Sequence, residues 1–285
     1  MLKKLMLFVC FLIFVATSFA AKVETVNIKS QAMNKEIPTL VISHEHLTEV
    51  GSPVIYLLHG YAGNEKSWSI IQPKLQSIAD RYNLIFVCPY GENNWYLDSP
   101  IDKSIRYETF ISSELVKYID AHYATGENKS ARAITGFSMG GYGAIRTAIL
   151  HPEIFGAAGS ASGAFELINL PSIPIDTSPR KDFNISSVLG KDKKLWKQYS
   201  LFNTISKTQK IFPAIIIDCG YNDTLVFNTN NKFHKKLLEN NIAHDYIVRP
   251  GGHDITYWQN AIEYQILFFI NYFAENYYNS GKLKI

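Results

Sequence analysis

The chain has 285 residues, of which 47% are hydrophobic and 19% are charged, and its formal net charge is +3. This composition is typical of globular proteins and excludes long disordered or collagen-like regions. The length is sufficient to bury a substantial core in one large domain. The chain has no block of lysine and arginine of the size that follows a nucleic-acid backbone, so we expect no nucleic-acid partner.

The first twenty residues have the pattern of a secretory signal peptide. Lys3 and Lys4 form a short positive region, and an unbroken apolar run follows them. Residues 18–20, Ser-Phe-Ala, place small residues at the −3 and −1 positions of a cleavage site, so the mature chain would begin at Ala21. The apolar run is too short for a stable membrane span, although an uncleaved anchor is the alternative. We therefore expect an exported protein, periplasmic or secreted, with no membrane span after signal removal.

Residues 21–285 contain no repeat, low-complexity tract or linker, which predicts a single domain. Short apolar runs without polar alternation recur along them and end at glycine or proline. Such runs are typical of strands buried on both faces of a parallel sheet that is covered by helices. The runs are residues 54–58, 84–88, 131–135, 214–218 and 246–248.

Helical patterns lie between these runs, at residues 104–123, 139–150, 229–240 and 258–273. The alternation of strand and helix predicts an α/β fold, with a mostly parallel central sheet and helices on both faces. Residues 23–27 and 39–42 are expected to form an antiparallel edge. Residues 161–210 contain several prolines and no clear strand, so we interpret them as an insertion over the sheet.

A G-x-S-x-G pattern at residues 136–140 lies between a predicted buried strand and a predicted helix. A sharp turn from strand to helix needs small residues on either side of the serine, and it raises the hydroxyl above the sheet at a helix N-terminus. Ser138 is therefore the candidate nucleophile. A simple packing turn made of small residues is the alternative.

A serine hydroxyl is a weak nucleophile and needs a base. In such sheets the acid and the base follow the serine in that order, on loops after later strands. His253 follows the strand at 246–248 and is the candidate base. Asp223 lies just beyond the strand at 214–218 and is the candidate acid, which would hold the imidazole tautomer. Asp218 is the competitor but lies within the strand, and Asp254 adjoins the histidine and is poorly placed to reach its Nδ1.

The glycine-rich segment at residues 59–64 ends the first buried strand and can turn a backbone N–H towards a developing oxyanion. The second donor would be the N–H of Met139, immediately after the serine. His59 as a metal ligand is an alternative, but no cluster of histidine, cysteine and carboxylate accompanies it. A phosphate-binding loop is also disfavoured because no G-K-[ST] follows. The predicted chemistry needs no metal or organic cofactor.

Four separated motifs together resemble the esterase D-like branch of the α/β-hydrolases, at residues 57–64, 94–99, 136–141 and 250–254. That branch includes S-formylglutathione hydrolases, tributyrin, feruloyl and acetylxylan esterases, and mycolyltransferases. The resemblance extends from about residue 24 to residue 275. It implies the α/β-hydrolase fold, a triad of Ser138, Asp223 and His253, and oxyanion N–H donors at Tyr61 and Met139. The export signal departs from the cytosolic formylglutathione enzymes and disfavours that substrate.

The strand order of this family also bears on the two cysteines outside the signal peptide. Cys88 and Cys219 would end strands about four positions apart, which is about 19 Å at ordinary strand spacing. A disulfide tolerates only about 7 Å between Cα atoms. We therefore expect two free, buried thiols.

Trp95 and Tyr96, with Asp98 close by, follow the predicted strand at 84–88 on the same edge of the sheet as the catalytic candidates. We predict that both aromatic residues bind substrate, in an acyl or sugar pocket. A position in the core is the alternative, because aromatic residues make up 13% of the chain.

Together these features predict an exported serine carboxylesterase that acts on short-acyl or feruloyl-type esters, either small molecules or linked to polysaccharides. An acyltransferase, or a siderophore or thioester hydrolase, would use the same three side chains. A non-catalytic carbohydrate-binding protein on the same scaffold is the remote alternative. The sequence carries no signal for oligomeric state.

Overall fold

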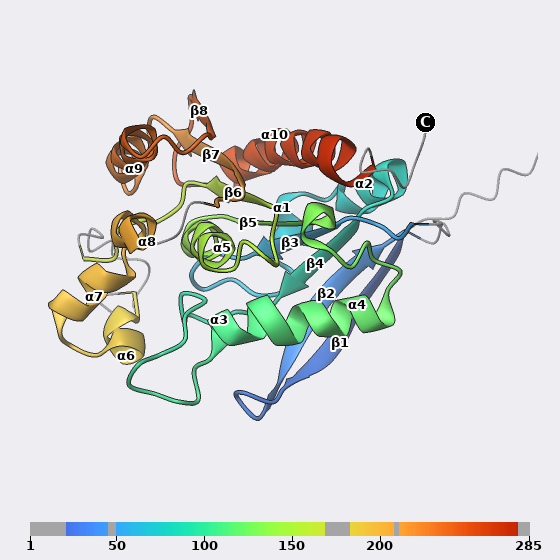
Figure 1. Cartoon of the computed structure of the whole chain (residues 1–285), viewed down its shortest axis with the longest axis horizontal. Helices are drawn as coiled ribbons and strands as arrows, with labels where there is room; N and C mark the ends of the chain where they lie inside the picture. Colours follow the sequence, from blue (N-terminus) through green and yellow to red (C-terminus); the bar gives the residue numbers. More distant parts are fainter. Residues whose placement is uncertain (1–20, 45–49, 169–182, 208–210, 279–285) are drawn as a thin grey trace, which may run out of the picture.

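The computed structural model describes residues 21–44, 50–168, 183–207 and 211–278 (Figure 1). The predicted signal peptide, residues 1–20, therefore lies outside the described residues. Parts of the predicted insertion, residues 169–182 and 208–210, also lie outside them.

The described residues form one eight-stranded sheet with the order β1-β2-β4-β3-β5-β6-β7-β8. Strand β1 is antiparallel to β2, and β2 is antiparallel to β4, whereas all other neighbours are parallel. The mostly parallel sheet and its antiparallel edge are therefore confirmed. The strands are β1 Lys22–Ser30, β2 Lys35–Ser43, β3 Val54–Leu58, β4 Ile85–Pro89, β5 Arg132–Gly136, β6 Ala157–Ala161, β7 Ala214–Gly220 and β8 Asp245–Arg249.

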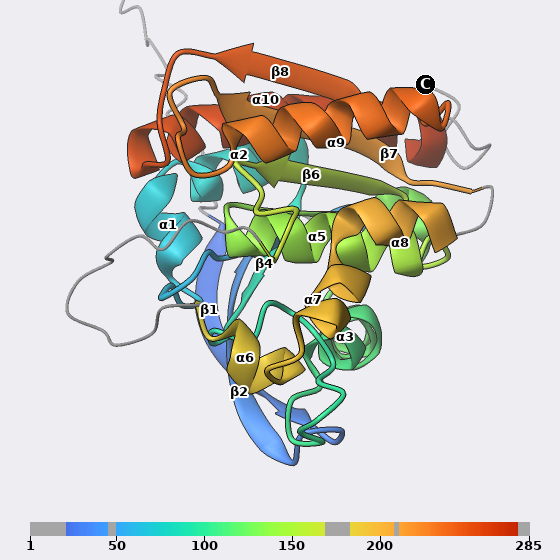
Figure 2. The ribbon, with the colours of Figure 1, turned by 90° about the vertical axis from the view of Figure 1, so that its left-hand side faces the viewer.

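Helices cover both faces of the sheet (Figures 1 and 2). One face packs against α3 (Tyr107–Thr109), the π-helix η1 (Phe110–Leu115), α4 (Val116–His122), α5 (Met139–Leu150) and α9 (Phe227–Glu239). The other face packs against α1 (Ser67–Ile71), α2 (Leu75–Tyr82) and α10 (Ile255–Phe273). Two further short helical elements are η2 (Lys129–Ala131), just before β5, and η3 (Ala274–Tyr278), just after α10. No helix among the described residues is long and apolar enough to cross a membrane.

Strand β3 shows why the buried strands lack polar alternation. Successive strand side chains point to opposite faces of a sheet. Val54, Tyr56 and Leu58 pack into the core that contains α5, while Ile55 and Leu57 pack into the core that contains α10. Both faces are buried, so every position is apolar.

Strand β6 was not predicted from the sequence. Its residues are Ala-Ala-Gly-Ser-Ala, which carry none of the β-branched or aromatic side chains enriched in strands. Small residues are needed here because α10 lies close to the sheet. A Cβ at Gly159 would lie 2.6 Å from Gln265 Oε1 and 3.0 Å from the Phe269 ring.

The segment interpreted as an insertion departs from the strand–helix alternation only after β6 ends at residue 161. It contains α6 (Ile185–Leu189), α7 (Lys193–Tyr199) and α8 (Leu201–Lys207). Figure 2 shows α8 beside α5, with α6 and α7 continuing away from it along the same side of the molecule. This segment therefore forms a helical wall next to the helix that follows Ser138.

Cys88 and Cys219 are both buried free thiols. They lie in β4 and β7, which are four positions apart in the sheet. The prediction of two unpaired cysteines is therefore confirmed, and burial raises the pKa of each thiol.

Candidate active site

Ser138 occupies a strained turn between β5 and α5. Its φ is 55° and its ψ is −117°, a region that residues other than glycine rarely adopt. Backbone hydrogen bonds hold it there: its N–H donates to Ala161 O at 3.0 Å, and its carbonyl accepts from the N–H groups of Tyr142 and Ala164. The turn lifts the side chain out of the sheet, as the sequence motif predicts.

The two glycines of the motif allow this turn to pack directly on β3. A Cβ at Gly136 would lie 2.4 Å from the backbone of Gly140. A Cβ at Gly140 would lie 2.2 Å from the carbonyl oxygen of Leu58 and 2.6 Å from that of His59. The first turn of α5 can therefore approach the end of β3 only because no side chain intervenes.

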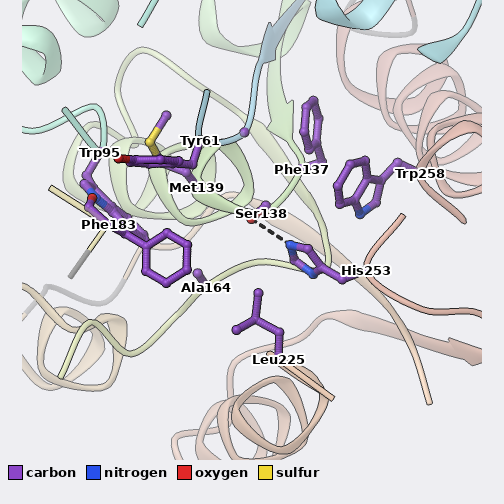
Figure 3. A pocket seen from close by; sticks show the side chains of 11 residues that line it. Tyr61, Trp95, Phe137, Ser138, Met139, Ala164, Phe183, Leu225, His253 and Trp258 are labelled. Carbon is purple, nitrogen blue, oxygen red and sulfur yellow. Dashed lines mark hydrogen bonds between the residues drawn. The ribbon is translucent and has the colours of Figure 1, made fainter. Parts of the chain in front are cut away.

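Ser138, His253 and Asp223 form one chain of hydrogen bonds. Ser138 Oγ lies 2.9 Å from His253 Nε2, and His253 Nδ1 lies 2.7 Å from Asp223 Oδ2 (Figure 3). The Asp223 side chain is fully buried. Its second oxygen accepts the N–H groups of Leu225 and Val226, each at 3.1 Å. A carboxylate only accepts hydrogen bonds, so it places the imidazole proton on Nδ1 and leaves Nε2 free to accept from the serine hydroxyl.

The two other candidate carboxylates have different partners. Asp218 is buried within β7, where it accepts hydrogen bonds from the Arg249 guanidinium and the Tyr257 hydroxyl. Burial is the largest influence on its pKa, which lies above the ordinary value. Asp254 caps α10, because its Oδ1 accepts the N–H of Tyr257 at 2.9 Å. Among the described residues, neither is a hydrogen-bond partner of His253.

A cavity of about 290 Å³ opens over Ser138 and His253, and most of its wall is apolar. Figure 3 shows Tyr61, Trp95 and Phe183 on one side of the serine, and Phe137 and Trp258 on the other. The full lining comprises Gly60, Tyr61, Trp95, Phe137, Ser138, Met139, Ala164, Phe183, Leu225, His253 and Trp258. Such a wall offers mainly apolar surface to a bound ligand.

Ring contacts link the aromatic residues of this wall. The rings of Phe137 and Trp258 are stacked, with centroids 4.4 Å apart, and Trp258 meets the His253 imidazole edge to face at 5.1 Å. On the opposite side, Tyr61 and Phe183 meet edge to face at 5.5 Å. The histidine is therefore held by a ring contact as well as by Asp223.

The two residues predicted to supply oxyanion donors both line the cavity next to the serine (Figure 3). Met139 is the first residue of α5, and the first N–H groups of a helix have no acceptor within the helix. Tyr61 lies in the loop that follows β3. Both residues therefore lie beside Ser138, and their role as backbone donors stays a prediction.

The structure separates the neighbouring residues Trp95 and Tyr96, which both have positive φ values, 59° and 55°. Trp95 lines the cavity, and its Nε1–H donates to the carbonyl of Phe183 at 2.9 Å. Tyr96 is 1% exposed and does not line the cavity; its hydroxyl donates to the carbonyl of His59 at 3.0 Å. The prediction that Tyr96 contacts substrate is therefore corrected to a core position. Asp98 forms an ion pair with Arg106 at 3.1 Å.

His59 holds two loops together. Its Nδ1–H donates to the carbonyl of Gly60 at 2.7 Å, and its Nε2 accepts the N–H of Gly91 at 2.8 Å. Burial lowers its pKa to about 4, so the ring is neutral at pH 7. Both nitrogens are occupied, which leaves none for a metal. The described part of the chain contains no group of three or more histidine, cysteine or carboxylate side chains that could hold a metal ion.

Several cavity residues were not identified from the sequence, among them Leu225, Trp258 and Phe183. Leu225 follows Asp223 by two positions, and Trp258 lies in the first turn of α10, just after His253. Their closeness to catalytic candidates was a usable signal. Phe183 had none, because it lies in the segment between β6 and β7, far from any motif.

Comparison with known proteins identifies the family of this chain. A family model described as "Putative esterase" matches residues 30–269. The "Acetyl esterase" of Caldicellulosiruptor saccharolyticus is 29% identical over 217 residues, which is 73% of this chain and 79% of that protein.

Two solved structures share the fold. The fluorophosphonate-binding serine hydrolase FphF of Staphylococcus aureus has a TM-score of 0.78 at 22% identity, covering 88% of this chain and 99% of its own. A ferulic acid esterase has a TM-score of 0.75 at 25% identity, covering 89% of this chain and 98% of its own. The chain therefore belongs to the "Putative esterase" family, has the α/β-hydrolase fold, and is a serine hydrolase acting on carboxylic esters.

Proposed function

We propose that this chain is an exported carboxylesterase that hydrolyses short-acyl or feruloyl-type esters, including esters linked to polysaccharides. Ser138 is the nucleophile, His253 the general base and acid, and Asp223 the group that orients the imidazole. The observation that carries the proposal is the chain of hydrogen bonds at 2.9 and 2.7 Å at the base of an apolar cavity.

The proposed reaction has two halves. His253 Nε2 takes the hydroxyl proton of Ser138 as Oγ attacks the ester carbonyl. The imidazolium then gives that proton to the leaving alcohol, which leaves an acyl group on Oγ. Water attacks this acyl-enzyme with the same base, and the free acid is released. Asp223 stabilises the imidazolium in both halves, since its buried carboxylate faces Nδ1.

Backbone donors stabilise the charge that develops on the carbonyl oxygen. The N–H groups of Tyr61 and Met139 serve this role, and both residues line the cavity beside Ser138. Loss of one such donor costs about 3 kcal/mol of transition-state stabilisation. The position of Met139 as the first residue of α5 supports this arrangement, because the first N–H groups of a helix have no acceptor within it.

The wall of the cavity supports the proposed acyl groups. Tyr61, Trp95 and Phe183 present aromatic surface on one side of Ser138, which suits an aromatic acyl group such as feruloyl. The names of two similar proteins, an acetyl esterase and a ferulic acid esterase, point to the same range of acyl groups.

Substitution of the nucleophile tests the proposal. Ser138→Ala should lower the kcat for p-nitrophenyl acetate by at least about 10⁴-fold and abolish labelling by a fluorophosphonate probe. Ser77→Ala, on the exposed side of α2, is the matched control and should keep full activity. Turnover retained in Ser138→Ala would contradict the assignment. A panel of acetyl, butyryl and feruloyl esters, with a sugar acceptor present, then ranks the acyl groups and separates hydrolysis from transfer.

A further inference from the structure

The first described residue of the chain is tightly held. Ala21 is 2% exposed and packs into the core formed with Leu75 and Ala79 of α2. Its N–H donates to Asp80 Oδ2 at 2.8 Å, and its carbonyl accepts from Gln76 Nε2 at 2.5 Å. Both backbone groups of Ala21 are thus bound by side chains of α2, whereas the ends of chains usually fray.

Within the described part of the chain, only one of the two oxygens of the Asp80 carboxylate forms a hydrogen bond, the one with Ala21. Among the described residues, Asp80 Oδ1 is buried and has no hydrogen-bond partner. A buried carboxylate oxygen without a donor is costly. A backbone amide offers one N–H, which Oδ2 already takes, whereas a free α-ammonium offers three and carries a positive charge.

We propose that Asp80 is the binding site for the free α-ammonium group of a mature chain that begins at Ala21. The inference rests on the proposed export but not on the proposed ester hydrolysis. Residues 18–20 have the small-residue pattern of a cleavage site that ends at this position. The predicted cleavage site thus lies directly before the residue whose nitrogen contacts the Asp80 carboxylate.

The processing step is hydrolysis by an endopeptidase that removes leader peptides. Water adds across the bond between the Ala20 carbonyl carbon and the Ala21 nitrogen: the new carboxylate leaves with the leader, and the new amine takes up a proton at neutral pH. The resulting ammonium then pairs with the Asp80 carboxylate. Cleavage thereby replaces a single hydrogen bond from a neutral amide with an ion pair that can satisfy both carboxylate oxygens.

This ion pair predicts a raised pKa for the α-amino group. Its ordinary value is about 8, and an opposite charge at this distance favours the protonated form. The neighbouring charged groups have other partners: Lys22 pairs with Glu24 at 2.8 Å, and Arg81 lies over the ring of Tyr82. The stabilisation is fully present below about pH 8 and is lost as the pH rises through the raised value.

Two measurements test the proposal separately. The full chain is exported from a bacterial host and its N-terminus is sequenced, with Ala21 as the expected first residue. Chains prepared to begin at Ala21 or at Ala20 are then acylated with acetic anhydride across a pH range. The midpoint of the pH–rate profile should lie about one pH unit higher for the Ala21 chain, so its acylation at pH 7.5 should be about tenfold slower.

Asp80→Asn keeps an acceptor for the Ala21 N–H but removes the charge, so it should return the midpoint to about pH 8. Asp245→Asn, at the exposed start of β8, is the matched control and should leave the midpoint raised. If Asp80→Asn does not fold, the Ala20 chain alone provides the comparison.

The outcomes distinguish the Asp80 site from the processing of the chain at Ala21. Equal midpoints for the Ala21 and Ala20 chains would overturn the Asp80 site, whatever the host does. An exported chain that begins at another residue would refute processing at Ala21, and an uncleaved chain would refute the proposed export as well. Ester hydrolysis measured on the same samples remains an independent result.

Discussion

At the scale of single residues, the carboxylates of Asp223 and Asp254 differ in their partners. Asp223 is buried, with one oxygen on His253 Nδ1 and the other on two backbone N–H groups. Asp254 adjoins the histidine in sequence but caps the following helix. Sequence order predicted which of the two carboxylates contacts His253, because a residue adjacent to the histidine is poorly placed to reach its Nδ1, whereas one on the loop after another strand can.

Asp223→Asn should lower kcat by about 10⁴-fold while the fold is retained, because an amide at this position no longer selects the Nδ1-protonated tautomer. Asp254→Asn is the matched control, since asparagine is an equally good N-cap. It should keep kcat within a few-fold of the wild-type value. Steady-state kinetics on p-nitrophenyl acetate make the comparison, and equal losses in both variants would show that Asp223 acts only structurally.

His59 gives the protein a specific acid sensitivity. Its pKa is about 4 in the folded state, against an ordinary value of 6.5, because burial disfavours the charged ring. Below pH 6.5 the unfolded chain binds this proton and the folded chain does not, so stability falls as the pH falls from 6.5 to 4. The shift corresponds to about 3 kcal/mol of unfolding free energy.

His59→Gln should flatten this part of the pH profile. Glutamine cannot titrate, but its oxygen can still accept the N–H of Gly91. Urea unfolding at pH 7 and pH 4 should show a smaller loss of free energy in the variant than in the wild type. Parallel losses in the two proteins would assign the acid sensitivity to other groups.

At the scale of elements, the strands that carry strong apolar patterns were predictable and β6 was not. Runs of valine, isoleucine and leucine identified β3, β4 and β7, because these strands are buried on both faces. Strand β6 is equally buried but is made of alanine, glycine and serine. Its small side chains are dictated by helices packed on it, and a sequence alone does not show which helix will pack there.

Close packing at the start of α5 makes Gly140→Ala a sensitive substitution. The new Cβ would lie 2.2 Å from the Leu58 carbonyl, so α5 and the end of β3 must move apart. We expect a loss of about 2 kcal/mol in unfolding free energy. Gly252→Ala is the control for stability, because its Cβ would lie 3.2 Å from the end of the Asp254 side chain and 3.9 Å from the Asn222 carbonyl oxygen. If Gly140→Ala leaves the unfolding free energy unchanged, α5 and the end of β3 can move apart without cost.

At the scale of the whole molecule, the order of the strands was predictable only through the family resemblance. Apolar runs show which segments are strands, but they do not show which strands are neighbours. The resemblance supplied the order, and with it the separation of Cys88 from Cys219. The cavity wall was the least predictable part, because Phe183 comes from a segment that has no motif.

The separation of the two thiols predicts that stability does not depend on redox conditions. Unfolding midpoints measured with and without reductant should agree. A thiol-alkylating reagent should modify neither Cys88 nor Cys219 in the native protein, because both are buried. The same reagent should modify both thiols once urea unfolds the protein. An intramolecular disulfide found by mass spectrometry would mean that the sheet order is different.

The position of Phe183 has a consequence for how such an enzyme diversifies. The reacting groups stand at the ends of β5, β7 and β8, whereas this ring arrives on the stretch leading into α6. Part of the cavity wall is thus encoded in a piece of polypeptide that carries none of the reacting groups. Replacement of residues 183–207 with related sequences can retune acyl preference while the reactive constellation stays intact, so directed evolution aimed at new substrates has a natural target there.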